Sequence, residues 1–166
     1  YIRHFTPGKN WNSLYTWDSG FIALGLIDVD ITKAFECIRA YTTPVGSESA
    51  FIHHGTPLPI QMYAYYDLWN NTQSKEALQF LYPRLKQFFD FMTGKNLYST
   101  TRMKGSGLLR TWDYFYNSGG WDDYPPQHAL RDKASVTPVV SSAYYIRAAK
   151  ILRLAAKELG LKKDVK

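Results

Sequence analysis

The segment from residue 74 to residue 94 reads SKEALQFLYPRLKQFFDFMTG, and its apolar side chains recur at the three- and four-residue intervals of an α-helix. They form one stripe, made of Ala77, Leu78, Leu81, Leu85, Phe88, Phe89 and Met92. Ser74 is a residue type that caps helix starts, and Gly94 suits a helix end. Pro83 marks either a joint or the first turn of a new helix. The segment therefore predicts helix at the centre of the chain.

The sequence before this segment shows the same pattern. Residues 17–27 are apolar and small, which suits a buried helix. Residues 31–42 are apolar at every third or fourth position and follow Asp30, an N-cap residue type. Thr56-Pro57 predicts the cap and the first residue of a third helix. No stretch has the alternation of strands joined by hairpin turns.

A last helix is predicted to begin at Thr137-Pro138 and to end at Gly160, about six turns later. One side of it is expected to hold Val140, Ala143, Tyr144, Arg147, Ile151, Leu154 and Ala155. Residues 95–126 lack periodicity and are rich in aromatic side chains, which is typical of a long functional loop. We predict an all-α fold of about five or six helices paired by short turns, with a plain bundle or a repeat solenoid as the simplest architectures.

The composition of the chain indicates which classes of ligand and partner are expected. With 166 residues the chain has the length of one domain, and its 16% aromatic content exceeds what packing requires, so some rings are expected to face a ligand such as a sugar. The formal net charge of +6 is concentrated in the last residues. Elsewhere Lys and Arg are scattered among acids without a nucleic-acid-binding motif, which argues against a nucleic-acid partner.

The single cysteine, Cys37, excludes an internal disulfide, and the four histidines lack the spacing of a zinc motif. No cofactor is therefore expected. No run of eighteen apolar residues occurs, so we expect a soluble chain without a membrane span. Its compartment is left open, with a periplasmic or secreted location as the candidates.

Residues 118–125 read SGGWDDYP and place two adjacent acids between glycines and aromatic rings. Trp121 and Tyr124 can form an apolar wall that raises the pKa of Asp122, as a proton donor to a glycosidic oxygen requires. Gly120 lets the backbone approach a ligand. Asp123 is a candidate substrate contact, with a structural role favoured over a catalytic one. The alternative is an ordinary surface turn, since Gly, Asp and Pro are common turn formers.

Four motifs come in the order found in glycoside hydrolase family 63: Trp17-Asp18-Ser19, Gly55-Thr56-Pro57, Gly120 to Pro125, and a long helix ending in Ala155 to Gly160. The same order is similar to that of the family 37 trehalases. The resemblance spans nearly the whole chain, although only the two Trp-Asp motifs are specific. It implies an inverting α-glycosidase built on an (α/α)6 toroid and acting on oligosaccharides of glucose or mannose.

The resemblance also implies roles for individual residues. Asp122 matches the family's general acid. Trp17 and Asp18 match a pair that lines the subsite of the cleaved sugar, where the carboxylate accepts hydrogen bonds from hydroxyls. Gly120 and Trp121 would shape the same pocket.

The chain differs from the family at positions that bear on the implied substrate and on the general base. Pro126-Gln127 replaces a basic residue that follows the acid motif, and Thr56-Pro57 replaces a Gln-Pro pair. Inverting hydrolysis needs a base about 6.5–9.5 Å from the acid, and the family's glutamate base lies far downstream. Neither Glu48 nor Glu158 matches its position.

A twelve-helix toroid needs on the order of 200 residues or more. Residues 1–166 are therefore expected to form a single partial catalytic domain, about half of the barrel, that lacks the C-terminal portion. The remainder of the domain or a partner chain would then supply the base.

Two other functions stay open. An inverting phosphorylase would use phosphate in place of water, for which Arg102, Lys104, Arg110 and His128 are loose candidates. A helical carbohydrate-binding module would stack sugars on its rings without catalysis.

Overall fold

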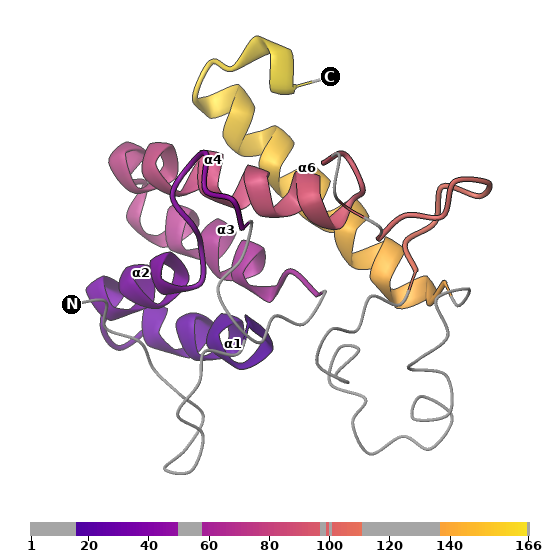
Figure 1. Cartoon of the computed structure of the whole chain (residues 1–166). Coiled ribbons are helices and arrows are strands. Elements are labelled where there is room, and N and C mark those ends of the chain that lie inside the picture. Colours follow the sequence, from indigo (N-terminus) through magenta and orange to yellow (C-terminus); the bar gives the residue numbers. More distant parts are fainter. Residues whose placement is uncertain (1–15, 50–57, 97–98, 100, 111–136, 166) are drawn as a thin grey trace.

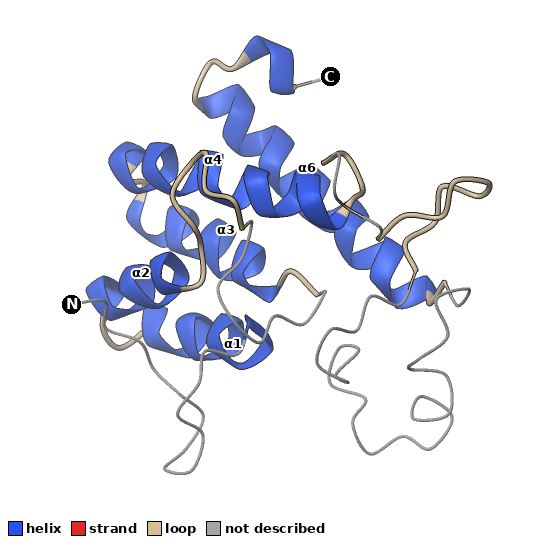
Figure 2. Ribbon diagram, in the orientation of Figure 1, coloured by secondary structure: helices blue, strands red, loops and turns tan. Residues whose placement is uncertain are grey.

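A computed structural model describes residues 16–49, 58–96, 99, 101–110 and 137–165 of the chain. This part holds five α-helices and one short 3-10 helix (Figures 1 and 2). Their bounds are α1 Thr16–Ile27, α2 Ile31–Ala40, α3 Ile60–Thr72, α4 Lys75–Met92, α6 Val139–Glu158 and η1 Lys162–Asp164. Among the described residues there is no strand, only an isolated antiparallel bridge between Arg102 and Leu109. The predicted all-α class is confirmed.

Helices that follow each other pack antiparallel. Near the end of α2, the Cys37 thiol donates to the backbone oxygen of Ser19 in the first turn of α1. α3 and α4 are joined by a turn of only two residues. Lys75 at the start of α4 lies 3.9 Å from Glu158, the last residue of α6. α1 with α2 and α3 with α4 therefore form αα-hairpins, and α4 and α6 are antiparallel neighbours.

The helices fall into two sets of opposite direction. Phe35 and Thr43 contact Phe80 and Gln87 in the same order along the chain, so α2 and α4 run parallel. α1, α3 and α6 run the other way, and α3 packs against both α1 and α6. At one end of the stack, α1, α3 and α6 therefore begin where α2 and α4 finish.

Two of the predicted helix starts are confirmed by their caps. The Asp30 carboxylate accepts a hydrogen bond from the backbone N–H of Lys33, and the Ser74 hydroxyl accepts one from Ala77. Each bond satisfies a backbone donor that the first turn of a helix leaves without a partner. The hydrogen bond from the Lys33 backbone is the main reason that the pKa of Asp30 is lowered.

The predicted start of the third helix is wrong. α3 begins at Ile60 with Pro59 as its N-cap residue, whereas Thr56 and Pro57 lie outside the described residues. The reason is Pro59, because the residue before a proline is disfavoured in helical conformation. Leu58 is therefore non-helical, and its buried side chain anchors the chain in front of α3.

Pro83 does not divide α4, which runs through it without interruption. Buried Leu81, Tyr82 and Leu85 flank the proline, and their packing holds the helix together across it. Gly94 follows the helix end with a φ of +75°, a left-handed conformation that suits glycine.

The buried face of α6 is rotated from the predicted one. It consists of Ser141, Tyr145, Ala148, Ile151, Leu152, Ala155 and Ala156. Leu154 is 43% exposed, and Ala143 and Arg147 are also exposed. The prediction followed the large apolar side chains, whereas small residues let α6 approach α3 and α4 closely.

One hydrophobic core connects the helices. Its largest fully buried apolar side chains are Tyr41, Tyr65, Phe88, Ile38, Leu58, Ile60, Met62, Leu78, Leu81, Leu85 and Met92. Burying a side chain of this size stabilises a fold by about 1.5–3 kcal/mol. The core therefore fixes the directions of the helices, and with them the end at which functional side chains gather.

Candidate functional site

Two of the predicted site residues belong to the described structure. Trp17 and Asp18 lie in the first turn of α1, and both are partly buried. The Trp17 ring packs edge-on against Phe21, with 5.0 Å between ring centroids. Asp18 is the acidic residue of this first turn, where the helix dipole favours negative charge. The remaining candidates lie outside the described residues, namely Gly120, Trp121, Asp122, Asp123 and Tyr124.

A close helix contact positions the first turn of α1. A Cβ atom at Gly20 would lie 2.8 Å from the backbone carbonyl carbon of Ile60, the first residue of α3. Only glycine allows this approach. The start of α1, with Trp17 and Asp18, is thereby held beside the start of α3.

Buried polar side chains gather at the same end of the helix stack. In the described part of the chain they are Ser19, Thr42, Thr43, Gln61, Thr101 and Ser141. All of them lie near the starts of α1, α3 and α6 or just beyond the ends of α2 and α4. We call this the polar end. Thr42, Thr43 and Thr101 are hydrogen-bonded within the chain. Convergent polar groups are also a feature of ligand sites, so the polar end is a candidate site.

Gln61 is the most unusual member of this group. It is 1% exposed, and among the residues that the structure describes neither its amide nitrogen nor its amide oxygen has a hydrogen-bond partner. Leaving a buried amide unsatisfied costs about 1–3 kcal/mol. The sequence carries a signal that could have found it, since Gln61 is a polar residue between the apolar Ile60 and Met62 in the first turn of a buried helix.

The chain on either side of segment 111–136 lies at the polar end. The Leu109 backbone N–H donates to the Ser142 hydroxyl at 3.2 Å, which ties residue 109 to the first turn of α6. On the other side, Thr137 directly precedes Pro138, the N-cap residue of α6. The Arg110 backbone N–H donates to the backbone oxygen of Thr101, another buried residue of the polar end.

Aromatic rings lie near the starts of α3 and α6. The rings of Tyr63 and Tyr144 stack with 5.7 Å between centroids, and the Arg147 guanidinium lies 4.4 Å from the Tyr63 ring. Burial raises the pKa of Tyr63 to about 12, although the charge of Arg147 acts in the opposite direction. Tyr63 is therefore neutral at ordinary pH. Each tyrosine carries a hydroxyl on an aromatic ring, a combination that suits sugar rings.

The structure places the other candidates for a base and for a phosphate site at different points, with Arg110 partly buried near the polar end. Glu158 pairs with Lys75 at the end of the stack opposite the polar end, and Glu48 is exposed in the loop after α2. Arg102 is exposed and donates to the backbone oxygen of Gly107 within its own turn. Lys104 is exposed on the same turn, and His128 lies outside the described residues.

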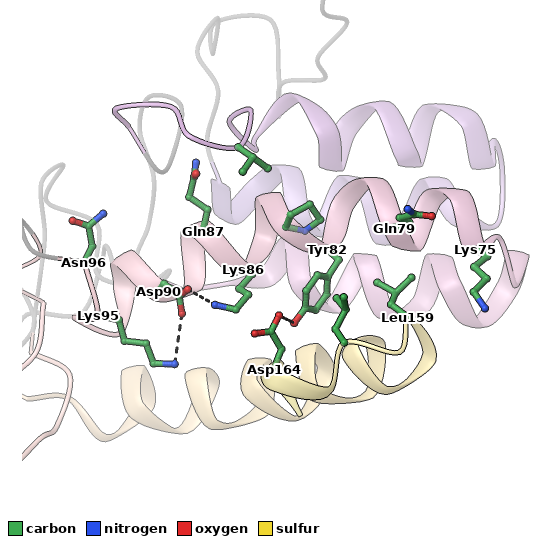
Figure 3. A pocket seen from close by; sticks show the side chains of 13 residues that line it. Lys75, Gln79, Tyr82, Lys86, Gln87, Asp90, Lys95, Asn96, Leu159 and Asp164 are labelled. Atoms are coloured by element: carbon green, nitrogen blue, oxygen red, sulfur yellow. Dashed lines mark hydrogen bonds and ion pairs between the residues drawn. The ribbon is translucent and has the colours of Figure 1, made fainter. Parts of the chain in front are cut away.

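A hollow that the sequence did not predict runs along α4, away from the polar end (Figure 3). It has a volume of about 800 Å³. Lys86 and Lys95 both pair with Asp90, and Tyr82 donates to the Asp164 carboxylate at 3.0 Å. Burial first, and then Asp164, raises the pKa of Tyr82 above its ordinary range. The Lys86-Asp90 spacing of four residues was the available signal.

Among the described residues, no cluster of three His, Cys, Asp or Glu side chains could hold a metal ion. Within the same residues, no helix is long and apolar enough to cross a membrane. Comparison with protein-family models, with curated proteins and with solved structures finds no match to this chain. Its function is therefore argued from its own residues.

Proposed function

We propose that this chain is the acid-bearing part of an inverting α-glycosidase whose sugar site lies at the polar end. Asp122 is the general acid that protonates the glycosidic oxygen. Trp17 and Asp18 hold the sugar on the cleaved side of the bond, through ring stacking and hydrogen bonds to hydroxyl groups. Trp121 and Tyr124 provide the apolar surroundings of Asp122, and Gly120 and Asp123 are the other residues of the pocket.

One observation carries the proposal. The Trp17-Asp18 turn, the buried polar side chains and both described flanks of segment 111–136 meet at one end of the stack. A sugar site needs aromatic faces together with convergent polar groups that have no other partner. Gln61 is such a group, because its buried amide has two donors and an acceptor available for hydroxyls.

The opposed directions of the helices support the proposed architecture. Parallel α1, α3 and α6, with α2 and α4 packed on them in the reverse direction, are the arrangement from which an (α/α)6 toroid is built. The described helices would form about half of such a barrel. The domain of residues 1–166 would be partial, and the glutamate base would come from the remainder of the catalytic domain or from a partner chain.

The chemistry assigns different protonation states to the two acids. Asp18 stays ionised in the first turn of α1 and accepts hydrogen bonds from the sugar. Asp122 must hold its proton until the bond breaks, which the apolar rings beside it in sequence favour. Water activated by the base then attacks the opposite face of the sugar and inverts the anomeric centre.

The test is the substitution Asp122→Asn in the protein as its source cells make it, with Asp123→Asn as the matched control. Turnover of α-glucosides or α-mannosides is followed by proton NMR, which reports the anomer released. We expect Asp122→Asn to lower turnover by about 10²–10⁴-fold while sugar binding persists, and the control to change it much less. Unchanged turnover in Asp122→Asn contradicts the acid role.

The same experiment separates the two alternatives. Sugar binding without turnover in the unmodified protein would favour the carbohydrate-binding module. Turnover that requires inorganic phosphate and releases a sugar phosphate would favour the phosphorylase. If no α-glucoside or α-mannoside changes the tryptophan fluorescence or is cleaved, the proposed sugar site is wrong.

A further inference from the structure

The outer side of α4 forms a groove with the end of the chain. Two hollows, of about 800 and 440 Å³, share Tyr82, Lys86, Asp90, Lys95 and Asp164 and so form one continuous surface. The turn after α6 walls one side of it, because Tyr82 holds Asp164 and Arg153 donates to the backbone oxygen of Val165. We call this surface the α4 groove, and Figure 3 shows the side chains of its larger hollow.

The α4 groove carries an excess of positive charge. Its six cationic side chains are Lys75, Lys86, Lys95, Lys150, Arg153 and Lys163. Its two anionic side chains are Asp90 and Asp164. Asp90 pairs with Lys86 and Lys95, and Glu158 pairs with Lys75. The excess positive charge therefore comes from Lys150, Arg153 and Lys163, which are exposed at the rim. A ligand that fits this surface brings carboxylates or other anions.

Apolar side chains lie among these charges. Val45 is 64% exposed and Ile146 is 59% exposed, and Leu161 and the Pro83 ring line the same groove. Gln87 holds the loop that carries Val45 in place, since its amide oxygen accepts a hydrogen bond from the Gly46 backbone. The complementary partner is therefore both acidic and apolar, which describes an amphipathic segment.

The arrangement of the helices indicates that this segment is helical. α4 packs on α3 and α6, and the smaller hollow opens between α4 and the Ile146, Lys150 and Arg153 side chains of α6. A helix laid there would contact both α4 and α6. The face of α4 from Lys75 to Asp90 is about 22 Å long, which matches a helix of about 15 residues.

From the charge and the shape we propose that the α4 groove docks an acidic amphipathic helix of a partner protein. Pairing of the α4 grooves of two copies of this chain is disfavoured, because both carry the same positive charge. An anionic membrane is disfavoured by the concave shape and by Asp90 and Asp164 in the lining. The proposal is independent of the sugar chemistry at the polar end.

The test uses a fluorescent synthetic helix of about 15 residues, with leucine at every third or fourth position and glutamate elsewhere. A version with lysine in place of glutamate is its control. We expect the acidic helix to bind with a dissociation constant in the micromolar range that weakens with added salt, and the basic one not to bind.

Substitutions inside and outside the α4 groove test whether the acidic helix binds there. Lys150→Glu is expected to weaken binding about fivefold, whereas Lys104→Glu, an equally exposed reversal outside the groove, leaves it unchanged. Ile146→Ser is expected to weaken it several-fold and Val139→Ser not at all. All four side chains are exposed, and circular dichroism checks that each variant folds.

Several results would overturn the proposal. The first is equal binding of the acidic and the basic helix. Another is an equal effect of Lys104→Glu and Lys150→Glu. Absence of binding at about 1 mM peptide would also overturn it, as would binding to phosphatidylserine vesicles that is lost in Lys150→Glu while the peptide fails to bind.

Discussion

Gly20 of α1 packs directly against Ile60, the first residue of α3, and a side chain at position 20 would collide with it. A Cβ there would lie 2.8 Å from the Ile60 backbone carbonyl carbon. Because two main chains meet, the clash cannot be relieved by a rotamer change. We expect Gly20→Ala to lower the free energy of unfolding by about 1–3 kcal/mol, measured by urea denaturation.

The same helix provides the control. Gly25 has no atom within 4 Å of the position that a Cβ would take, so alanine meets no obstacle there. Gly25→Ala should raise the free energy of unfolding by about 0.5–1 kcal/mol through helix propensity. If both variants change stability in the same direction, the close α1 to α3 contact is wrong.

Cys37 provides a chemical probe of the core. Its thiol is fully buried and donates to the backbone oxygen of Ser19, and burial raises its pKa to about 12. Since the thiolate is the reactive form, labelling by a disulfide reagent at pH 8 should be at least about a thousandfold slower in the folded chain than in urea. Reaction within seconds under native conditions would contradict this packing.

A hydrogen bond between Tyr82 and Asp164 fastens η1 to α4. The Tyr82 hydroxyl donates to the Asp164 carboxylate at 3.0 Å, across 82 residues of sequence. Tyr82→Phe should lower the free energy of unfolding by about 1 kcal/mol and speed amide exchange in η1. Asp164→Asn keeps an oxygen acceptor and should have a smaller effect. Unchanged exchange in Tyr82→Phe would show that the turn is held by other contacts.

Two buried tyrosines should lower the free energy of unfolding at alkaline pH. Burial raises the pKa of Tyr65 and Tyr145 above the ordinary value near 10. Above pH 10 the unfolded chain loses these protons while the folded chain keeps them, so the stability is complete below pH 10 and falls as pH rises further. Each such tyrosine contributes a slope of up to about 1.4 kcal/mol per pH unit.

Tyr65→Phe tests this dependence. The variant loses a hydrogen bond to the Leu78 backbone oxygen and so starts less stable at pH 8. Its stability should nevertheless fall less steeply between pH 10 and pH 11.5 than that of the unmodified chain. An identical slope would mean that Tyr65 titrates normally in the folded protein.

The helices were predictable where a single local signal decides them. Asp30 and Ser74 cap the helices that their residue types indicate, and the stripe around Leu81 and Leu85 is buried as expected. Pro83 and the face of α6 were not predictable, because both depend on packing. A proline is tolerated when its neighbours are buried. The buried face of α6 mixes alanine and serine with larger side chains, so its position is visible only once the partner helices are placed.

The candidate site was predictable only in part. Trp17 and Asp18 stand in a helix start, as their motif indicated, whereas Asp122 lies outside the described residues. The meeting of α1, α3 and α6 at one end could not be foreseen, because it depends on contacts such as Gly20 with Ile60. The α4 groove was missed because it joins α4 to the turn around Asp164, far away in the sequence.

Gln61 links stability to the proposed function. Its amide is buried without a hydrogen-bond partner, so Gln61→Met, which keeps the length of the side chain, removes an unsatisfied polar group. We expect the free energy of unfolding to rise by about 1–2 kcal/mol. If the amide serves sugar hydroxyls, the same variant binds α-glucosides or α-mannosides more weakly, which is the usual conflict between stability and function.

Gln87→Met is the matched control for this prediction. The Gln87 amide donates to the Thr43 hydroxyl at 2.8 Å and accepts from the Gly46 backbone at 2.9 Å, so its loss should lower stability by about 1 kcal/mol and leave sugar binding unchanged. Urea denaturation of both variants gives opposite signs if Gln61 is unsatisfied. A loss of stability in Gln61→Met would mean that its amide is hydrogen-bonded, for instance to buried water, and would remove it from the sugar site.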